Sequence, residues 1–178
     1  MIPFGILEVK SGQLNVVYGI SYETSDFIVD CLESWWLSKD TTFQHIKKLV
    51  INLDNGPQCS SARTQFIKRM VEFSDQNNIE IHLIYYPPYH SKYNPIERCW
   101  GVLESHWNGT LLDNALKVMS WTKTMTWKGI NPVVKLIEDV YEKGVKLTKK
   151  AFGVFEKRLL RDEQLPKYSV VIQPRQDG

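Results

Sequence analysis

The chain has 178 residues, enough to bury a hydrophobic core, and its 43% hydrophobic and 24% charged content is typical of a globular protein. No apolar stretch approaches the ~18 residues of a membrane-spanning helix, and the N-terminus lacks the basic and apolar layout of a signal peptide. We therefore expect a cytoplasmic protein without a membrane partner. Cys31, Cys59 and Cys99 are far apart, which predicts reduced thiols and argues against a disulfide framework or a zinc site.

The net charge of +2 conceals an uneven distribution. Residues 1–40 carry two Lys against six Asp and Glu, whereas residues 117–161 carry eleven Lys and Arg against four Asp and Glu. The second segment has a net charge of +7 and could contact the phosphates of a nucleic acid. Lysines that only keep amphipathic helices soluble are the alternative.

The first 40 residues predict a β-hairpin and a helix. Two apolar runs, residues 4–10 and 14–22, flank a short polar turn. Thr24 or Ser25 then caps the helix. Its core-facing rows repeat at i, i+4 and i+8, and they are Phe27, Cys31 and Trp35 beside Ile28, Leu32 and Trp36. Its acidic residues lie off these rows and are expected to be solvated; they are Asp26, Asp30 and Glu33.

A strand, a helix and a second strand follow. Residues 47–54 are apolar nearly throughout, which predicts a strand buried in the centre of a sheet. Ser60 or Ser61 caps the next helix. Its inward-facing side chains are Phe66, Ile67, Met70 and Val71. Residues 79–86 predict another central strand.

The last part of the chain is predicted to be mainly helical. One helix begins after Asn94, and another covers residues 111–119. Asn131-Pro132, an N-cap followed by proline, starts a third helix that runs to residue 143 and ends at Gly144. Thr148 caps a fourth helix to about residue 161, and residues 168–174 form an extended tail.

Two acidic residues stand at the ends of these elements. Asp54 ends the apolar strand, in Leu53-Asp54-Asn55-Gly56, and Glu97 opens the helix that follows Asn94. Each has a structural alternative, because Asp54 could serve only the turn and Glu97 occupies the acidic position of a capping box. Carboxylates are also the ligands that Mg²⁺ and Mn²⁺ prefer. Two of them placed in this way suggest metal-dependent phosphoryl transfer.

The segments around these two acids resemble a known family. Leu53-Asp54-Asn55-Gly56 is followed by a helix, a strand and then Pro87-Pro88-Tyr89-His90-Ser91-Lys92-Tyr93-Asn94-Pro95-Ile96-Glu97-Arg98-Cys99-Trp100. This arrangement is similar to the second and third acidic motifs of DDE transposases of bacterial insertion sequences, which are distantly related to mariner-like elements. Residues 3–6, 35–36, 107–109 and 168–175 also resemble that family.

The resemblance implies an α/β, RNase H-like catalytic core in residues 1–127, with a mixed sheet flanked by helices. Residues 128–178 would then form a helical C-terminal extension with an extended tail. The first acid of the family lies on a strand upstream of the matching residues, so we expect a truncated copy in which that strand is missing. Glu8 is the nearest substitute for this acid, and a solvent-facing place on the hairpin is its alternative role.

The resemblance also implies the chemistry and the partners. Asp54 and Glu97 would be catalytic ligands of Mg²⁺ or Mn²⁺, with two ions expected in the complete enzyme. Four residues near Glu97 would contact DNA, namely Lys92 and Arg98 at phosphates, Asn94 in the polar loop and Tyr93 by stacking on an unpaired base. We predict a transposase that cuts and joins DNA as a homo-oligomer at the nucleoid. Without the missing strand, the truncated chain alone is expected to lack strand-transfer activity. An RNase H-like nuclease and a non-catalytic remnant that binds DNA or associates with intact transposase are the alternatives.

Overall fold

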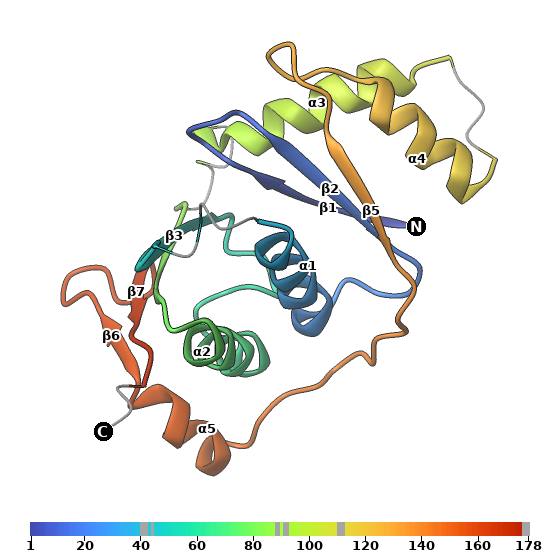
Figure 1. The fold of residues 1–178 in the computed structure, drawn as a ribbon. Coiled ribbons are helices and arrows are strands. Elements are labelled where there is room, and N and C mark those ends of the chain that lie inside the picture. The colour runs from blue at the N-terminus through green and yellow to red at the C-terminus, as the bar shows by residue number, and fades with distance from the viewer. Residues whose placement is uncertain (40–42, 44, 88–89, 91–92, 110–112, 176–178) are drawn as a thin grey trace. The chain divides into compact units, whose positions relative to one another are not determined.

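The computed structural model describes residues 1–178 apart from 40–42, 44, 88–89, 91–92, 110–112 and 176–178. Two compact units make up the chain, and each is built from two separate stretches of it. Unit 1 comprises Met1–Tyr22 and His90–Val140, and unit 2 comprises Glu23–Tyr89 and Tyr141–Gly178. Each unit has its own mixed sheet (Figure 1). None of the described helices has the length and apolar character that a membrane crossing requires.

Unit 1 begins with the predicted hairpin, which is confirmed. Strands β1 (Ile2–Leu7) and β2 (Leu14–Gly19) pair in antiparallel fashion, and β5 (Val133–Ile137) lies parallel to β2 on its other side. Helices α3 (Pro95–Trp107) and α4 (Ala115–Thr124) pack against this sheet (Figure 1). The buried residues of this core come from β2, α3 and the end of α4, and they are Leu14, Val16, Tyr18, Cys99, Leu103 and Met125.

The predicted helix over residues 131–143 is wrong, because these residues include β5. The side chain of Asn131 does not cap a helix; its Nδ2 donates to the carbonyls of Lys123 (3.1 Å) and Met125 (2.9 Å). The segment that follows is Val-Val-Lys-Leu-Ile, whose β-branched residues favour a strand. Pairing with β2 supplies the backbone partners, so tertiary context overrides the local helix signal.

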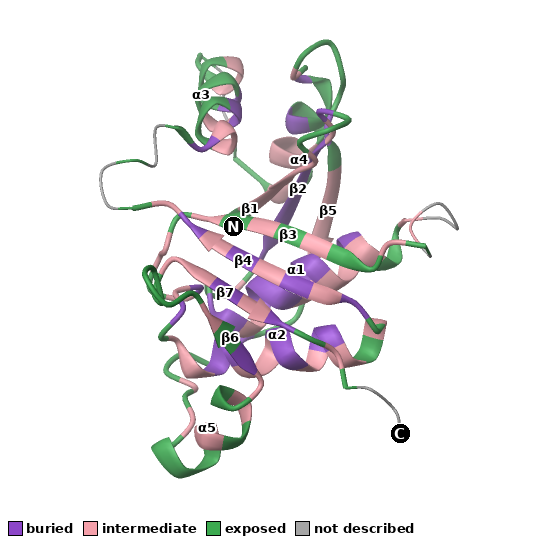
Figure 2. Ribbon diagram, turned by 90° about the vertical axis from the view of Figure 1, so that its left-hand side faces the viewer, coloured by how far each residue is buried: buried purple, intermediate pink, exposed green. Residues whose placement is uncertain are grey.

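Unit 2 contains a four-stranded sheet in the order β3-β4-β7-β6. The strands are β3 (Lys48–Leu53), β4 (Glu80–Tyr85), β6 (Leu159–Arg161) and β7 (Ser169–Ile172). Helices α1 (Ser25–Leu37) and α2 (Thr64–Asn77) cover one face of the sheet, and their buried sides face it (Figure 2). Helix α5 (Lys149–Glu156) packs beside α2. The predicted caps Thr24 and Thr148 are confirmed, since each side chain accepts a hydrogen bond from a backbone N–H three residues later.

Several expectations for unit 2 need correction. Strand β3 is not central: it lies at the edge of the described sheet, and Val50 at its middle is 48% exposed. Helix α2 begins at Thr64, after an N-cap Arg63 that makes no side-chain cap, so neither Ser60 nor Ser61 caps it. Residues 168–174 are not a free tail, because they contain β7, which pairs with β4 and β6. The helix predicted to reach about residue 161 ends earlier, because α5 stops at Glu156 and the residues after it form β6.

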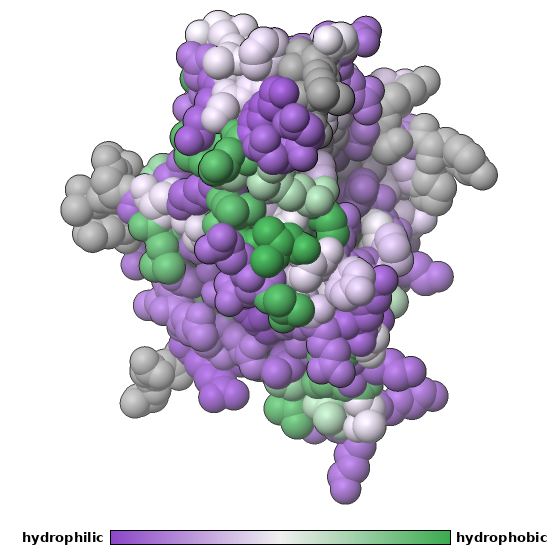
Figure 3. Space-filling model, turned by 90° about the vertical axis from the view of Figure 1, so that its right-hand side faces the viewer, coloured by the Kyte–Doolittle hydropathy of each residue, from purple (hydrophilic) through white to green (hydrophobic). Residues whose placement is uncertain are grey.

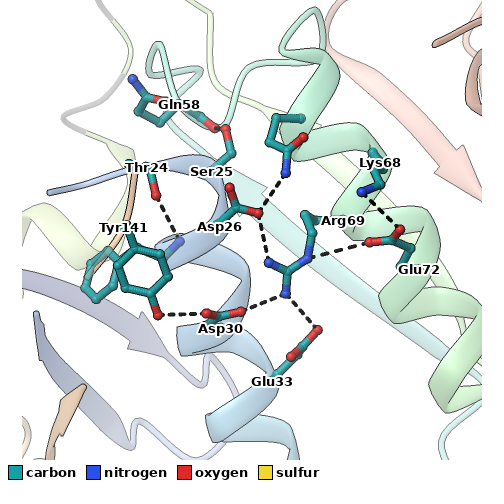
Figure 4. Close-up of polar contacts among 12 residues, drawn as sticks. Thr24, Ser25, Asp26, Asp30, Glu33, Gln58, Lys68, Arg69, Glu72 and Tyr141 are labelled. Atoms are coloured by element: carbon teal, nitrogen blue, oxygen red, sulfur yellow. Dashed lines mark hydrogen bonds and ion pairs between the residues drawn. The ribbon is translucent and has the colours of Figure 1, made fainter. Parts of the chain in front are cut away.

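The acidic residues of α1 are not simply solvated. Arg69 on α2 lies between them and makes contacts of 2.9 Å to Asp26, 2.7 Å to Asp30 and 3.3 Å to Glu33 (Figure 4). The hydroxyl of Tyr141 donates to the other oxygen of Asp30 at 2.7 Å. Arg69 is only 19% exposed, so these contacts are partly shielded from water and join α1, α2 and the segment around Tyr141.

Hydrophobic side chains also reach the surface. Figure 3 shows a face on which they interrupt an otherwise largely hydrophilic surface. The most exposed large ones are Val9, Leu37, Leu116, Val140 and Val154. Apolar atoms make up much of the surface of any folded protein, so exposed hydrophobic side chains do not by themselves indicate a function.

The predicted α/β class is confirmed, with mixed sheets and flanking helices. The order of the first seven elements, two strands and then helix, strand, helix, strand, helix, is also as predicted. The described strands do not form one continuous sheet, because the hairpin pairs with β5 and β3 pairs with β4. The boundary between residues 127 and 128 stays a prediction.

Candidate functional site

Asp54 directly follows β3 and is exposed. Its carboxylate folds back over the turn, where Oδ1 accepts a hydrogen bond from the backbone N–H of Gly56 at 3.1 Å. Asn55 between them has a φ of +63°, a left-handed conformation that Asn tolerates better than most residues. The Asp-Asn-Gly sequence therefore fixes the direction of the carboxylate, and no described residue donates a hydrogen bond to Oδ2.

The thiol of Cys59 is the second group at Oδ1 of Asp54, with an Sγ to Oδ1 distance of 3.6 Å. Burial, followed by the negative charge of Asp54, raises the pKa of Cys59 to about 12. The thiol is therefore protonated at neutral pH and can donate. Partial desolvation and the charge of Asp54 also raise the pKa of Glu23, just before α1. Neither residue was singled out from the sequence; a buried Cys five residues after the acid gives no signal by itself.

Glu97 lies in the first turn of α3, in the position predicted for it. Asn94 caps the helix, because its side chain accepts from the N–H of Ile96 at 3.4 Å, and Pro95 follows as the first helical residue. The side chain of Glu97 is exposed and makes no hydrogen bond or ion pair with any described residue. Gly101, one turn later, has open space where a Cβ would stand. This face of α3 is therefore bare around the carboxylate.

The helix is held against β1 by a close contact. A Cβ on Gly5 would lie 2.6 Å from Cζ2 of Trp100 and 3.1 Å from Cδ1 of Ile96. Both of these residues flank Glu97 in the sequence, so the glycine in β1 helps to set where the first turn of α3 lies. The similarity at residues 3–6 gave no hint of this contact.

Asp54 belongs to unit 2 and Glu97 to unit 1. Their closeness stays a prediction, as does their role as metal ligands. Within the part of the chain that the structure describes, no three His, Cys, Asp or Glu side chains form a group suited to a metal ion. Glu8 is engaged inside the hairpin, where its carboxylate accepts from Ser11 Oγ at 3.1 Å and from Asn15 Nδ2 at 3.2 Å.

The four predicted DNA contacts have different surroundings. Lys92 lies outside the described residues. Arg98 and Tyr93 are exposed, and the ring of Tyr93 stands 5.8 Å from that of His90. Asn94 is buried and uses its side chain as the helix cap. Their roles at DNA remain predictions.

The basic segment of residues 117–161 is divided between the units. Residues 117–140 of unit 1 hold four Lys against two acidic residues, whereas residues 141–161 of unit 2 hold seven Lys and Arg against two. Both arginines of the second group form ion pairs: Arg158 contacts Asp75 at 2.6 Å and Arg161 contacts Glu156 at 2.8 Å. The positive charge is thus concentrated around α5, where Lys149 and Lys150 are exposed in the first turn.

The mixed α/β architecture is consistent with a DDE transposase domain. The model of the family described as the Rhodopirellula transposase DDE domain matches residues 1–174. The chain therefore belongs to this family of insertion-sequence DDE transposases. No curated protein and no solved structure matched the chain. The family generally uses divalent metals and acts on DNA.

Proposed function

We propose that this protein catalyses metal-dependent cleavage and joining of DNA strands during transposition of an insertion sequence. Family membership over residues 1–174 is the observation that carries the proposal. The core would be RNase H-like, with Asp54 and Glu97 as metal ligands. Two Mg²⁺ or Mn²⁺ ions, when bound, would stabilise the attacking and leaving oxygens of an in-line displacement at phosphorus.

The surroundings of Asp54 suit this role. Its carboxylate is exposed at the end of β3, and its direction is set by the hydrogen bond from Gly56. A turn residue alone needs only Oδ1, and no described donor reaches Oδ2. A carboxylate that is oriented but still has an open oxygen can bind a hard cation without first losing other partners.

Glu97 is also available for a ligand. In a capping box its side chain would bond to the backbone N–H of Asn94, but no such hydrogen bond occurs among the described residues. The cap is instead provided by Asn94 itself. Glu97 therefore stands at a helix N-terminus, where a carboxylate is electrostatically favoured, with its oxygens open to solvent.

The substrate side of the proposal rests on charge and exposure. Tyr93 and Arg98 beside Glu97 are exposed, as a base-stacking ring and a phosphate contact should be. The lysines of residues 141–161 would add contacts to phosphates that do not depend on sequence. A homo-oligomer on DNA is part of the same proposal.

Joining of labelled transposon-end oligonucleotides in Mg²⁺ tests the enzymatic role. Asp54→Asn and Glu97→Gln should each reduce cleavage and joining to background. Asp162→Asn is the matched control for Asp54, because Oδ1 of Asp162 likewise accepts backbone N–H groups in a turn, here two of them, at 2.9 and 2.8 Å. Glu104→Gln is the control for Glu97, since it is exposed two turns further along α3. Both controls should retain activity.

The products separate the alternatives. Cut DNA without joined product would favour a nuclease. Metal-independent DNA binding with neither product, in a protein folded by circular dichroism, would favour a DNA-binding remnant over an active enzyme.

A further inference from the structure

The two oxygens of the Asp54 carboxylate have unequal surroundings. Oδ1 faces the backbone N–H of Gly56 at 3.1 Å and the thiol of Cys59 at 3.6 Å, whereas no described residue donates to Oδ2. The thiol has a second acceptor, the carbonyl oxygen of Gly56 at 3.8 Å. An ionised carboxylate is the stronger acceptor, so the thiol hydrogen is expected to point at Asp54.

Cys59 is held in place by groups on two other elements. Its side chain is 7% exposed, and its carbonyl accepts a hydrogen bond from the hydroxyl of Tyr85, at the end of β4, at 2.9 Å. Just before it, the carbonyl of Gln58 accepts from Ser25 Oγ, in the first turn of α1, at 2.7 Å. The sulfur is therefore a fixed donor, whereas an exposed side chain could turn away from the carboxylate.

We propose that Cys59 is a positioning residue for Asp54: its thiol occupies Oδ1 together with Gly56, so that Oδ2 alone is offered to a divalent cation. The inference rests on the proposed role of Asp54 as a metal ligand. It adds a specificity-determining residue that acts through the carboxylate and does not touch the metal or the DNA.

A consequence for metal choice follows. Mg²⁺ demands near-octahedral geometry, whereas Ca²⁺ accepts six to eight ligands and both oxygens of one carboxylate. An Asp54 restricted to one oxygen favours the smaller ion. Without the thiol, Oδ1 loses a partner and the carboxylate can turn toward a bidentate arrangement, which raises the relative affinity for Ca²⁺.

A purely structural role makes different predictions. A buried free cysteine can act as a small apolar side chain, and its loss then changes stability but not metal preference. Cys31 provides the matched comparison, because it is a buried free thiol of α1 in the same unit. Its substitution by Ala removes the same atom without changing the partners of Asp54.

The first experiment measures Mn²⁺ binding to the full chain by electron paramagnetic resonance, with Mg²⁺ and Ca²⁺ as competitors. Cys59→Ala should reduce the ratio of Mg²⁺ to Ca²⁺ affinity by about tenfold, the lower end of what loss of an outer partner of a ligand costs. Cys59→Ser keeps a donor and should stay close to the wild type, and Cys31→Ala should leave the ratio unchanged. An unchanged ratio in Cys59→Ala would overturn the inference.

Asp54→Asn separates this inference from the proposed function. If Asp54→Asn leaves Mn²⁺ binding intact, Asp54 is not a ligand and both ideas fail. If Asp54→Asn abolishes binding while Cys59→Ala keeps the wild-type ratio, only the role of Cys59 fails.

A second measurement needs neither metal nor a stable Cys59→Ala protein. The infrared S–H stretching band of Cys59, assigned by its loss in Cys59→Ser, should move to higher frequency in Asp54→Asn, because an amide oxygen is a weaker acceptor than a carboxylate. A band at the same frequency in both proteins would show that the thiol does not donate to Asp54.

Discussion

Trp100 lies so close over Gly5 that a Cβ at this glycine would come within 2.6 Å of the indole ring. Such a separation essentially never occurs between real atoms, so the place of α3 on β1 requires glycine at this position. We expect Gly5→Ala to lower the free energy of unfolding by about 1–3 kcal/mol, as overpacked cores do. Urea unfolding followed by tryptophan fluorescence measures the change.

A second substitution tests the cause of that loss. Trp100→Phe removes the ring atoms that meet the new Cβ, so the double variant should be less destabilised than the sum of the single changes. If the two changes in unfolding free energy simply add, the contact between the new Cβ and Trp100 is not the cause of the loss.

Gly101 is expected to behave in the opposite way. A Cβ there meets no atom within 4 Å, and Ala is favoured over Gly inside a helix by roughly 0.5–1 kcal/mol. Gly101→Ala should therefore stabilise the protein and yet weaken DNA binding in Mg²⁺, if the DNA backbone approaches the bare face beside Glu97. Gly153→Ala in α5, also open at its Cβ, is the control for the stability gain. Undiminished DNA affinity in Gly101→Ala would argue against this approach.

Lys149 and Lys150 are also expected to affect stability and DNA binding in opposite directions, here through their charge. They occupy the first turn of α5, which has no acidic residue, although the helix dipole disfavours positive charge there. Replacing both by Gln should raise stability by about 0.3–1 kcal/mol. The same change should reduce the salt dependence of DNA binding by roughly one to two phosphate contacts. Lys10→Gln, in the hairpin turn outside the basic segment, should leave the salt dependence unchanged; an equal effect would contradict the assignment.

Asp75 gives a prediction for pH. Burial acts to raise its pKa, but hydrogen bonds from the Arg158 guanidinium and the Arg175 backbone outweigh burial and hold the pKa below its usual value. A carboxyl whose pKa is lowered by folding adds stability above its unfolded pKa, about 3.9, and loses it as pH falls through the folded value. The advantage of wild type over Asp75→Asn should therefore be constant near neutral pH and shrink below about pH 4. An advantage that persists in strong acid would refute this explanation.

The distance between Asp54 and Glu97 is the most direct test of the candidate site. If both hold metal ions of one site, their carboxylates should approach within about 8 Å when Mn²⁺ and DNA are bound. A crystal structure of that complex would show the Mn²⁺ positions by anomalous scattering. Carboxylates that remain far apart, with Mn²⁺ bound elsewhere, would end the metal-site hypothesis.

The sequence predicted what depends on local pattern. The hairpin, the caps at Thr24, Asn94 and Thr148, and the strand before Asp54 all follow from periodicity and capping, and the structure has them. Asn131-Pro132 failed because a cap followed by proline can also precede a strand that pairs with a distant partner, here β2. The edge position of β3 could not be predicted for the same reason, because the composition of a strand does not show which strands pair with it.

The surroundings of the acids were harder to predict. Asp54 and Glu97 could be selected from the sequence because both end elements, but Cys59 could not, since its contact with Asp54 depends on how the loop is folded. Arg69 was equally hidden, because its acidic partners come from a helix about 40 positions earlier in the chain. Contacts of this kind can be identified only from the folded structure and not from the sequence pattern.

The chain passes from one unit to the other three times, after Tyr22, Tyr89 and Val140. During synthesis β2 therefore cannot pair with β5 until more than 100 further residues have been made, since Asn15 pairs with Val133. Strand β4 likewise lacks its partner β7 until the end of the chain is made. Contacts so distant in sequence slow folding, and unpaired strand edges expose the nascent chain to aggregation. A fragment that stops at residue 127 would lack β5 from the sheet of unit 1 and both β6 and β7 from the sheet of unit 2. Neither unit can therefore be produced intact by truncating the chain at one position.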